Sequence, residues 1–132
     1  MVQKFFMIID DDKDDRFFFK EALKKMLPSS ICLEANGGIE ALELLRTAEK
    51  LPDFIFLDIN MPRMDGRECL KELKKDAKLK NISVIMYSTS STEESIAEFL
   101  KLGASSYLNK PTDMNKLPEQ ILEAISRPIK PS

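Results

Sequence analysis

The sequence predicts an α/β protein built on one parallel sheet with helices on both of its faces. Two unbroken apolar runs, Phe5–Ile9 and Phe54–Leu57, show no alternation with polar residues, which is typical of strands buried on both faces. Strand-like runs alternate along the chain with segments whose apolar residues recur at helical spacing. Five such alternations favour a doubly wound (βα)5 sheet.

Length and composition are those of one ordinary globular domain. The chain has 132 residues and a net charge of −2, so it carries no overall basic field for nucleic acid or an anionic membrane surface. We expect residues 3–127 to form the domain and residues 128–132 to form a C-terminal tail. No apolar run reaches the roughly 20 residues of a membrane span, and residues 1–9 lack a signal-peptide pattern. The expected location is therefore the cytoplasm.

The first helix is predicted to begin at Asp14 and to end before Pro28. Its apolar residues recur at helical spacing and are Phe18, Phe19, Ala22, Leu23 and Met26. Because three consecutive phenylalanines cannot share one helix face, one of them should be partly exposed, and Phe17 is the candidate. The second strand, Ile31–Ala35, is short and carries Glu34, which suits a sheet edge.

A turn at residues 36–38 leads into the second helix, which is expected to run to about Ala48. Its apolar positions are Ile39, Ala41, Leu42, Leu44 and Leu45. After the central strand, a third helix is predicted beyond Gly66. That helix is marked by Cys69, Leu70, Leu73 and Ala77. Cys69 and Cys32 lie in apolar contexts without metal-type spacing, so we expect two buried thiols rather than a disulfide.

The fourth strand is predicted at residues 82–87 and ends in a run of small hydroxyl residues, 88–92. Ser91 and Glu94 have capping-box spacing, so the fourth helix is expected to start at Ser91. Its inner residues are Ile96, Phe99 and Leu100. Gly103 is a natural C-terminal stop for this helix.

The fifth strand, Ser106–Asn109, is short and flanked by polar residues, which again suits an edge. Because proline is tolerated only in the first helical turn, Pro118 places the start of the last helix near Asn115 or Lys116. Its apolar side is Leu117, Ile121, Leu122 and Ile125. The first, third and fourth strands are the most apolar and should be central. An order of 2-1-3-4-5 satisfies this with right-handed crossovers and is the order of flavodoxin-like folds.

Several polar side chains follow the strands where their carboxyl ends meet. These candidate site residues are Asp10, Asp11, Asp58, Ser88 and Lys110. Taken singly, each has an ordinary explanation as a charged turn, a turn hydroxyl or a solvated lysine. Asp14 and Asp15 are explained as acids of the first helical turn, where they favour the helix N-terminus.

Together the candidate residues point to phosphoryl chemistry. Three carboxylates in one place repel one another unless a counter-ion is present, and Mg²⁺ is the usual hard cation where phosphate is handled. Lys110 adds positive charge and Ser88 a donor, which suits phosphoryl transfer. Asp58 is then the nucleophile or acceptor. The chain has no histidine, so a partner must supply any phosphohistidine.

Four motifs in order resemble a known family. IIDDDKDDR, FIFLDINMPRMDG, VIMYSTS and GASSYLNKP look like the response-regulator receiver domain (CheY-like) of two-component signalling, here as a stand-alone single domain. The resemblance implies that Asp58 accepts a phosphoryl group from a histidine kinase or a histidine phosphotransfer protein. It implies that Asp11, Asp58 and the main-chain carbonyl of Asn60 hold Mg²⁺, with Asp10 acting through water.

The resemblance also implies a switch. Lys110 should contact the phosphoryl oxygens, Ser88 should close onto them, and Tyr107 should swing inward behind Ser88. The Lys110–Pro111 bond should be cis. Since no second domain is expected after Pro128, the output should be a changed surface on the fourth helix, fifth strand and fifth helix that meets another protein. We expect no direct contact with nucleic acid or membrane, and a monomer or weak homodimer.

Two other readings stay open from the sequence. One is a receiver-like interaction domain that works without phosphorylation. The other is an aspartate-nucleophile phosphatase, whose nucleophile belongs after the first strand in an Asp-x-Asp motif followed by Thr or Val. Here Asp10, Asp11 and Asp12 are followed by Lys13, which counts against the phosphatase.

Overall fold

The computed structural model describes residues 4–89 and 92–126, which form alternating strands and helices. In chain order the elements are β1 (Phe5–Ile9), α1 (Lys13–Met26), β2 (Ile31–Ala35), α2 (Gly38–Thr47), β3 (Phe54–Leu57), α3 (Gly66–Lys75), β4 (Ser83–Ser88), α4 (Glu93–Lys101), β5 (Ser106–Asn109), a 3-10 turn (Met114–Lys116) and α5 (Leu117–Ser126). All strand pairs are parallel, and the sheet order is β2-β1-β3-β4-β5. The predicted flavodoxin-like architecture and strand order are confirmed.

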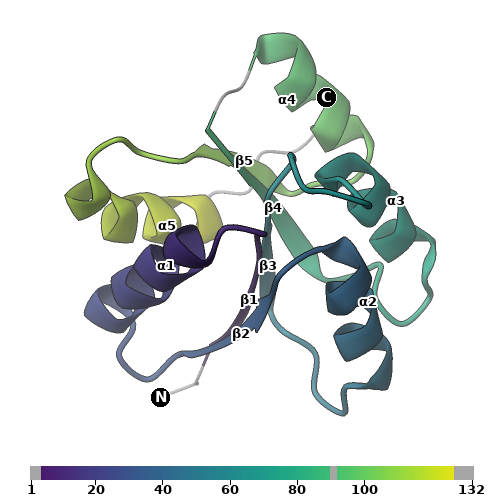
Figure 1. Ribbon diagram of the computed structural model, residues 1–132, viewed down its shortest axis with the longest axis horizontal. Helices are drawn as coiled ribbons and strands as arrows, with labels where there is room; N and C mark the ends of the chain where they lie inside the picture. The colour runs from purple at the N-terminus through teal and green to yellow at the C-terminus, as the bar shows by residue number, and fades with distance from the viewer. Residues whose placement is uncertain (1–3, 90–91, 127–132) are drawn as a thin grey trace.

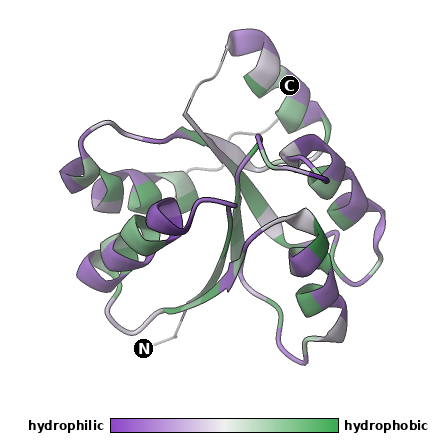
Figure 2. Cartoon of the chain, in the orientation of Figure 1, coloured by the Kyte–Doolittle hydropathy of each residue, from purple (hydrophilic) through white to green (hydrophobic). Residues whose placement is uncertain are grey.

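The helices form two layers around the sheet. Helices α1 and α5 lie side by side on one face, and α2 and α3 cover the other, with α4 beyond them (Figure 1). Apolar residues gather on the helix sides that face the sheet, while the outer sides are hydrophilic (Figure 2). None of the helices in residues 4–89 and 92–126 has the length and apolar character that a membrane span requires.

Each face of the sheet has its own buried core. Phe6, Phe19 and Phe56 pack together under α1 and α5. Ile55 and Leu73 belong to the cluster under α2, α3 and α4. The middle strands are buried on both faces because both cores need apolar partners, which is why their sequences do not alternate. Burying one large apolar side chain contributes about 1.5–3 kcal/mol.

Several apolar residues that helical spacing assigned to the core are in fact exposed. They are Phe18, Ile39, Leu44, Ala77 and Leu122. Phe17 is 54% exposed, as predicted, but Phe18 is 43% exposed as well. A short helix on a flat sheet buries a single stripe, so residues beside that stripe stay in water. Ala77 lies after the end of α3, and the buried residue there is Leu79.

The start of α4 differs from the prediction. Thr92, not Ser91, is the N-cap: its hydroxyl accepts a hydrogen bond from the Ser95 N–H, and the Ser95 hydroxyl accepts one from the Thr92 N–H. This is a capping box shifted by one residue, with serine instead of glutamate as the reciprocal partner. Ser91 itself lies outside the described residues, as do residues 128–132 of the predicted tail.

The two cysteines are free thiols, as predicted, but only Cys69 is buried, whereas Cys32 is half-buried. Burial raises the pKa of both Cys32 and Cys69 to about 12, so neither is ionised at neutral pH.

Candidate functional site

The parallel sheet brings the ends of β1, β3, β4 and β5 to one edge. The Asp58 N–H donates to the Ile9 carbonyl at 2.9 Å, which continues the pairing of β3 with β1. The Lys110 N–H donates to the Ser88 carbonyl at 2.7 Å, which does the same for β5 and β4. Ser88 is therefore the last residue of its strand, and Asp58 and Lys110 are the first residues beyond theirs.

Three carboxylates meet at this edge. Oxygens of Asp10, Asp11 and Asp58 all lie within 4.8 Å of one another. Asp10 is fully buried and Asp58 is 6% exposed, whereas Asp11 faces solvent. The Asp12 N–H donates to Asp10 Oδ1 at 3.0 Å and holds that side chain in place. A buried cluster of hard oxygen donors with one open side fits a partly hydrated Mg²⁺.

The loop after Asp58 is held against the start of α3. The Gly66 N–H donates to the Ile59 carbonyl at 2.7 Å, and Asp65 caps α3 by accepting from the Glu68 N–H at 2.9 Å. A Cβ at Gly66 would touch the Asp58 carbonyl oxygen and lie 2.7 Å from the Ile59 Cα. Glycine is thus required here by space, because only its bare backbone lets the helix approach the acid.

Lys110 lies among the acids. Its ammonium donates to Asp10 Oδ2 at 2.7 Å and to Asp15 Oδ2 at 2.9 Å, and lies 3.6 Å from Asp58 Oδ1. Only 7% of its side chain is exposed, and the Tyr87 ring lies 5.3 Å from the ammonium. Sequence reasoning missed Asp15, which it treated only as an acid of the first helical turn. The chain carries no local signal for this ion pair, since 95 residues separate its members.

Burial and mutual repulsion set the protonation of the acids. Burial is the main cause that raises the pKa of Asp58 to about 6, and the negative charge of Asp10 is the second. Burial also raises the pKa of Asp10, although the Lys110 hydrogen bond opposes the rise. For Lys110, burial alone would lower the pKa, but the hydrogen bonds to Asp10 and Asp15 outweigh it and the pKa rises. The lysine stays charged, but its single positive charge does not offset two buried carboxylates, whose ionised forms stay unfavourable unless a metal ion binds.

We expect the metal-free protein to lose stability as the pH rises from about 5 to about 7. The Asp58 carboxyl ionises near pH 3.8 in the unfolded chain but near pH 6 in the folded one. Its contribution is therefore complete below the unfolded value and is lost as the pH rises through the folded value, by about 1 kcal/mol over this window. Urea unfolding with a chelator measures the loss. Saturating Mg²⁺ should reduce it, and an equal loss with and without Mg²⁺ would contradict the cation assignment.

A hollow is lined by residues of the Asp58 loop, the end of β4, α4 and β5. It has a volume of about 320 Å³, and its lining includes Asn60, Ser88, Phe99 and Tyr107. The Tyr107 ring lies 6.3 Å from that of Phe99. Arg67 on α3 pairs with Glu98 on α4, and its guanidinium lies 5.4 Å from the Phe99 ring. The predicted switch residues Ser88 and Tyr107 therefore border one shared space.

The structure brings the predicted site residues to one edge of the sheet. Asp10, Asp11, Asp58 and Lys110 make the contacts given above, and Asn60 follows in the exposed loop. That Asn60 supplies a main-chain ligand stays a prediction. One expectation is wrong: the Lys110–Pro111 bond is trans, since the described chain has no cis peptide bond.

The chain is similar to known proteins of one family. The model of the family described as "Response regulator receiver domain" matches residues 6–122. The chain is 31% identical to the chemotaxis protein CheY-3 of Vibrio cholerae over 92% of this chain and 91% of that protein. Some relatives are much longer: the chain spans 13% of the length of the Helicobacter pylori sensor histidine kinase CheAY, with 35% identity.

Two solved structures of response regulators have this fold. One is the phosphorylated cyanobacterial phytochrome response regulator RcpA, with a TM-score of 0.83 and 32% identity over 95% of this chain and 92% of that one. Another is the Mn²⁺-bound form of the response regulator Rcp1, with a TM-score of 0.80 and 28% identity over 93% of this chain and 92% of that one. A Synechocystis relative has the same name, Rcp1.

Proposed function

The chain belongs to the response-regulator receiver domain family of two-component signalling, and we propose that it accepts a phosphoryl group on Asp58. The observation that carries the proposal is the position of this carboxylate. It is buried at the end of β3, within reach of two further acids and 3.6 Å from the Lys110 ammonium. The Lys110 ammonium, together with a divalent cation held by the acids, would neutralise charge on a transferring phosphoryl group.

In the proposed reaction a carboxylate oxygen of Asp58 attacks the phosphorus of a phosphohistidine. An O–P bond forms, the N–P bond breaks, and its electron pair returns to the partner's imidazole. Bound Mg²⁺ supplies positive charge to the phosphoryl oxygens. Asp11, Asp58 and the Asn60 carbonyl are its proposed ligands, with Asp10 acting through water. Lys110 contacts the phosphoryl oxygens from the other side.

The proposed output is a change of surface rather than catalysis on another molecule. The chain assists only its own phosphorylation and dephosphorylation. Ser88 closes onto the phosphoryl group, and Tyr107 follows it into the hollow beside Phe99, which is large enough to admit a ring. The surface formed by α4, β5 and α5 then meets a downstream protein, because the phosphorylated form favours one of two conformations.

The proposal also covers the phosphoryl donor, the domain bounds, the oligomeric state and the location of the protein. The proposed donor is a histidine kinase or a histidine phosphotransfer protein, as the family suggests, and its phosphohistidine lies outside these 132 residues, which contain no histidine. The receiver domain spans residues 3–127, acts as a monomer or weak homodimer in the cytoplasm, and binds neither nucleic acid nor membrane directly.

Incubation with a small phosphodonor such as acetyl phosphate tests the acceptor role. With Mg²⁺, intact-protein mass spectrometry should show the addition of one phosphoryl group, which is lost on mild alkaline treatment as acyl phosphates are. An excess of chelator should prevent the addition, because the site then carries uncompensated carboxylates. Labelling that persists at an unchanged rate without divalent cation would contradict the proposal.

The same samples test the switch. Hydrogen exchange should change in α4 and β5 on phosphorylation, while α2, which contacts β2 at the opposite edge of the sheet from β5, serves as the internal control. Equal exchange in α4 and β5 with and without the phosphoryl group would leave the acceptor role intact but contradict the proposed output.

A further inference from the structure

We propose that Asp15 is a positioning residue that holds the Lys110 ammonium toward the phosphoryl group on Asp58. The inference deepens the proposed function and rests on it. It concerns a contact between the start of α1 and the end of β5, which no local sequence pattern predicts. The carrying observation is the 2.9 Å ion pair between Asp15 Oδ2 and Lys110 Nζ.

The Lys110 ammonium has enough hydrogen-bond donors for Asp10, Asp15 and a phosphoryl group on Asp58. A lysine ammonium has three donors and no acceptor. Two of them are used by Asp10 at 2.7 Å and Asp15 at 2.9 Å, which leaves the third donor, and Asp58 Oδ1 lies 3.6 Å from the ammonium nitrogen. A phosphoryl group on Asp58 extends beyond its carboxylate and so takes up the third donor. Asp15 thus restrains a long, flexible side chain in the orientation that the proposed contact needs.

The backbone of Asp15 is itself held over the site. The Asp12 side chain accepts from the Asp14 and Asp15 N–H groups at 2.8 and 3.3 Å. Arg16, the next residue, donates from Nη1 to the Asp10 carbonyl at 2.6 Å and from Nε to Glu34 at 3.2 Å. These contacts anchor the first turn of α1 to the ends of β1 and β2. The backbone of Asp15 is therefore held in place relative to the site. An acid that acted only through the helix dipole would not need this restraint.

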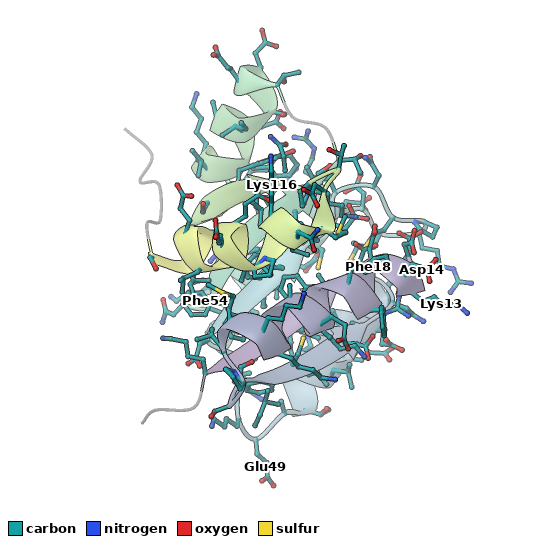
Figure 3. The ribbon with its side chains drawn as sticks, turned by 90° about the vertical axis from the view of Figure 1, so that its left-hand side faces the viewer. Lys13, Asp14, Phe18, Glu49, Phe54 and Lys116 are labelled. Atoms are coloured by element: carbon teal, nitrogen blue, oxygen red, sulfur yellow. The ribbon has the colours of Figure 1, made fainter. Side chains whose placement is uncertain are left out.

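A comparison with Asp14 separates positioning from the helix-end effect. Asp14 belongs to the same first turn, carries the same charge and projects outward from the end of α1 (Figure 3). Both acids interact with the helix dipole to a similar extent. Only 28% of the Asp15 side chain is exposed, and it faces Lys110. The neutral variant Asp14→Asn is therefore a matched control for Asp15→Asn.

The direction of the effect distinguishes positioning from simple charge. Asp15 adds negative charge near a site for an anion, so on charge alone its neutralisation would strengthen anion binding. If Asp15 positions Lys110, its neutralisation frees the ammonium and weakens anion binding. The two explanations predict opposite signs.

Binding of beryllofluoride, a mimic of the phosphoryl group, in the presence of Mg²⁺ measures this sign. We expect Asp15→Asn to weaken beryllofluoride binding by about three- to tenfold, as for loss of one partly buried ionic hydrogen bond. Asp14→Asn should stay within about twofold of the wild type, since exposed charges contribute little. Asp15→Glu, which restores the charge, should recover part of the loss. Unchanged or tighter binding by Asp15→Asn would overturn the inference.

A readout that does not depend on phosphoryl chemistry completes the test. The ¹⁵N-labelled Lys110 ammonium should give a slowly exchanging nuclear magnetic resonance signal in the wild type and in Asp14→Asn, because it is buried and paired. In Asp15→Asn the signal should shift and exchange faster. A wild-type chain that fails to bind beryllofluoride would contradict the proposed function, and the ammonium signal would still decide whether Asp15 holds Lys110.

Discussion

Asp58→Asn is expected to abolish labelling by a small phosphodonor in the presence of Mg²⁺. Asparagine has nearly the same shape, but its neutral amide oxygen is a poor nucleophile and a weaker metal ligand than a carboxylate. The variant should fold, because the amide removes a buried negative charge that is itself unfavourable: burial and the neighbouring Asp10 charge raise the pKa of Asp58 to about 6. Mass spectrometry gives the labelled fraction, and urea unfolding confirms that the protein is intact.

Two further variants complete the test. Glu49→Gln makes the same acid-to-amide change at an exposed position remote from the site, and should label like the wild type (Figure 3). Labelling of Asp58→Asn at the wild-type rate would contradict the acceptor assignment. Hydrolysis of a phosphomonoester that is lost in Asp10→Asn but kept in Asp58→Asn would instead support the phosphatase reading.

Gly66→Ala is expected to have the second largest effect, destabilising the protein by at least about 2 kcal/mol and slowing its phosphorylation. The added Cβ would meet the Asp58 carbonyl oxygen and the Ile59 Cα, which are main-chain atoms that cannot turn away. Either α3 moves outward, which opens its packing, or the Asp58 loop moves, which displaces the acceptor. Both movements cost packing energy, and the second also disturbs the acid cluster.

Gly37→Ala is the matched control for this substitution. A Cβ at Gly37 has no atom within 4 Å, and its backbone is extended, with φ of 176°. Urea unfolding and the rate of labelling should therefore stay near the wild-type values in Gly37→Ala. Equal stability of Gly66→Ala and Gly37→Ala would show that α3 can yield at no cost, and would contradict the close approach.

Local patterns were sufficient for the architecture and for most of the site. The runs Phe5–Ile9 and Phe54–Leu57 predicted buried central strands, and Glu34 predicted an edge at β2. The sheet order follows because each strand's burial is encoded in its own residues. Once the order is known, Asp10, Asp58 and Lys110 must meet, since parallel strands end on the same side.

Patterns were weaker where two neighbouring positions could serve one purpose. Thr92 rather than Ser91 caps α4, and the first turn uses Ser95 where the spacing pointed to Glu94. Adjacent hydroxyl residues have similar capping tendencies, so the entry angle of the chain decides between them. In the same way Phe18 is as apolar as Phe19, and only the orientation of α1 against the sheet determines which of them is buried.

Residues close together in the sequence were enough to predict the fold, the strand order and the convergence of acids and lysine on Asp58. Burial of each strand and the chemistry of each strand end are properties of neighbouring residues. The tertiary structure alone decided the Asp15–Lys110 ion pair and the seat of α3 on the Asp58 backbone at Gly66. Both depend on how a helix lies against a strand end, and ångström-scale packing distances are not encoded in any local pattern.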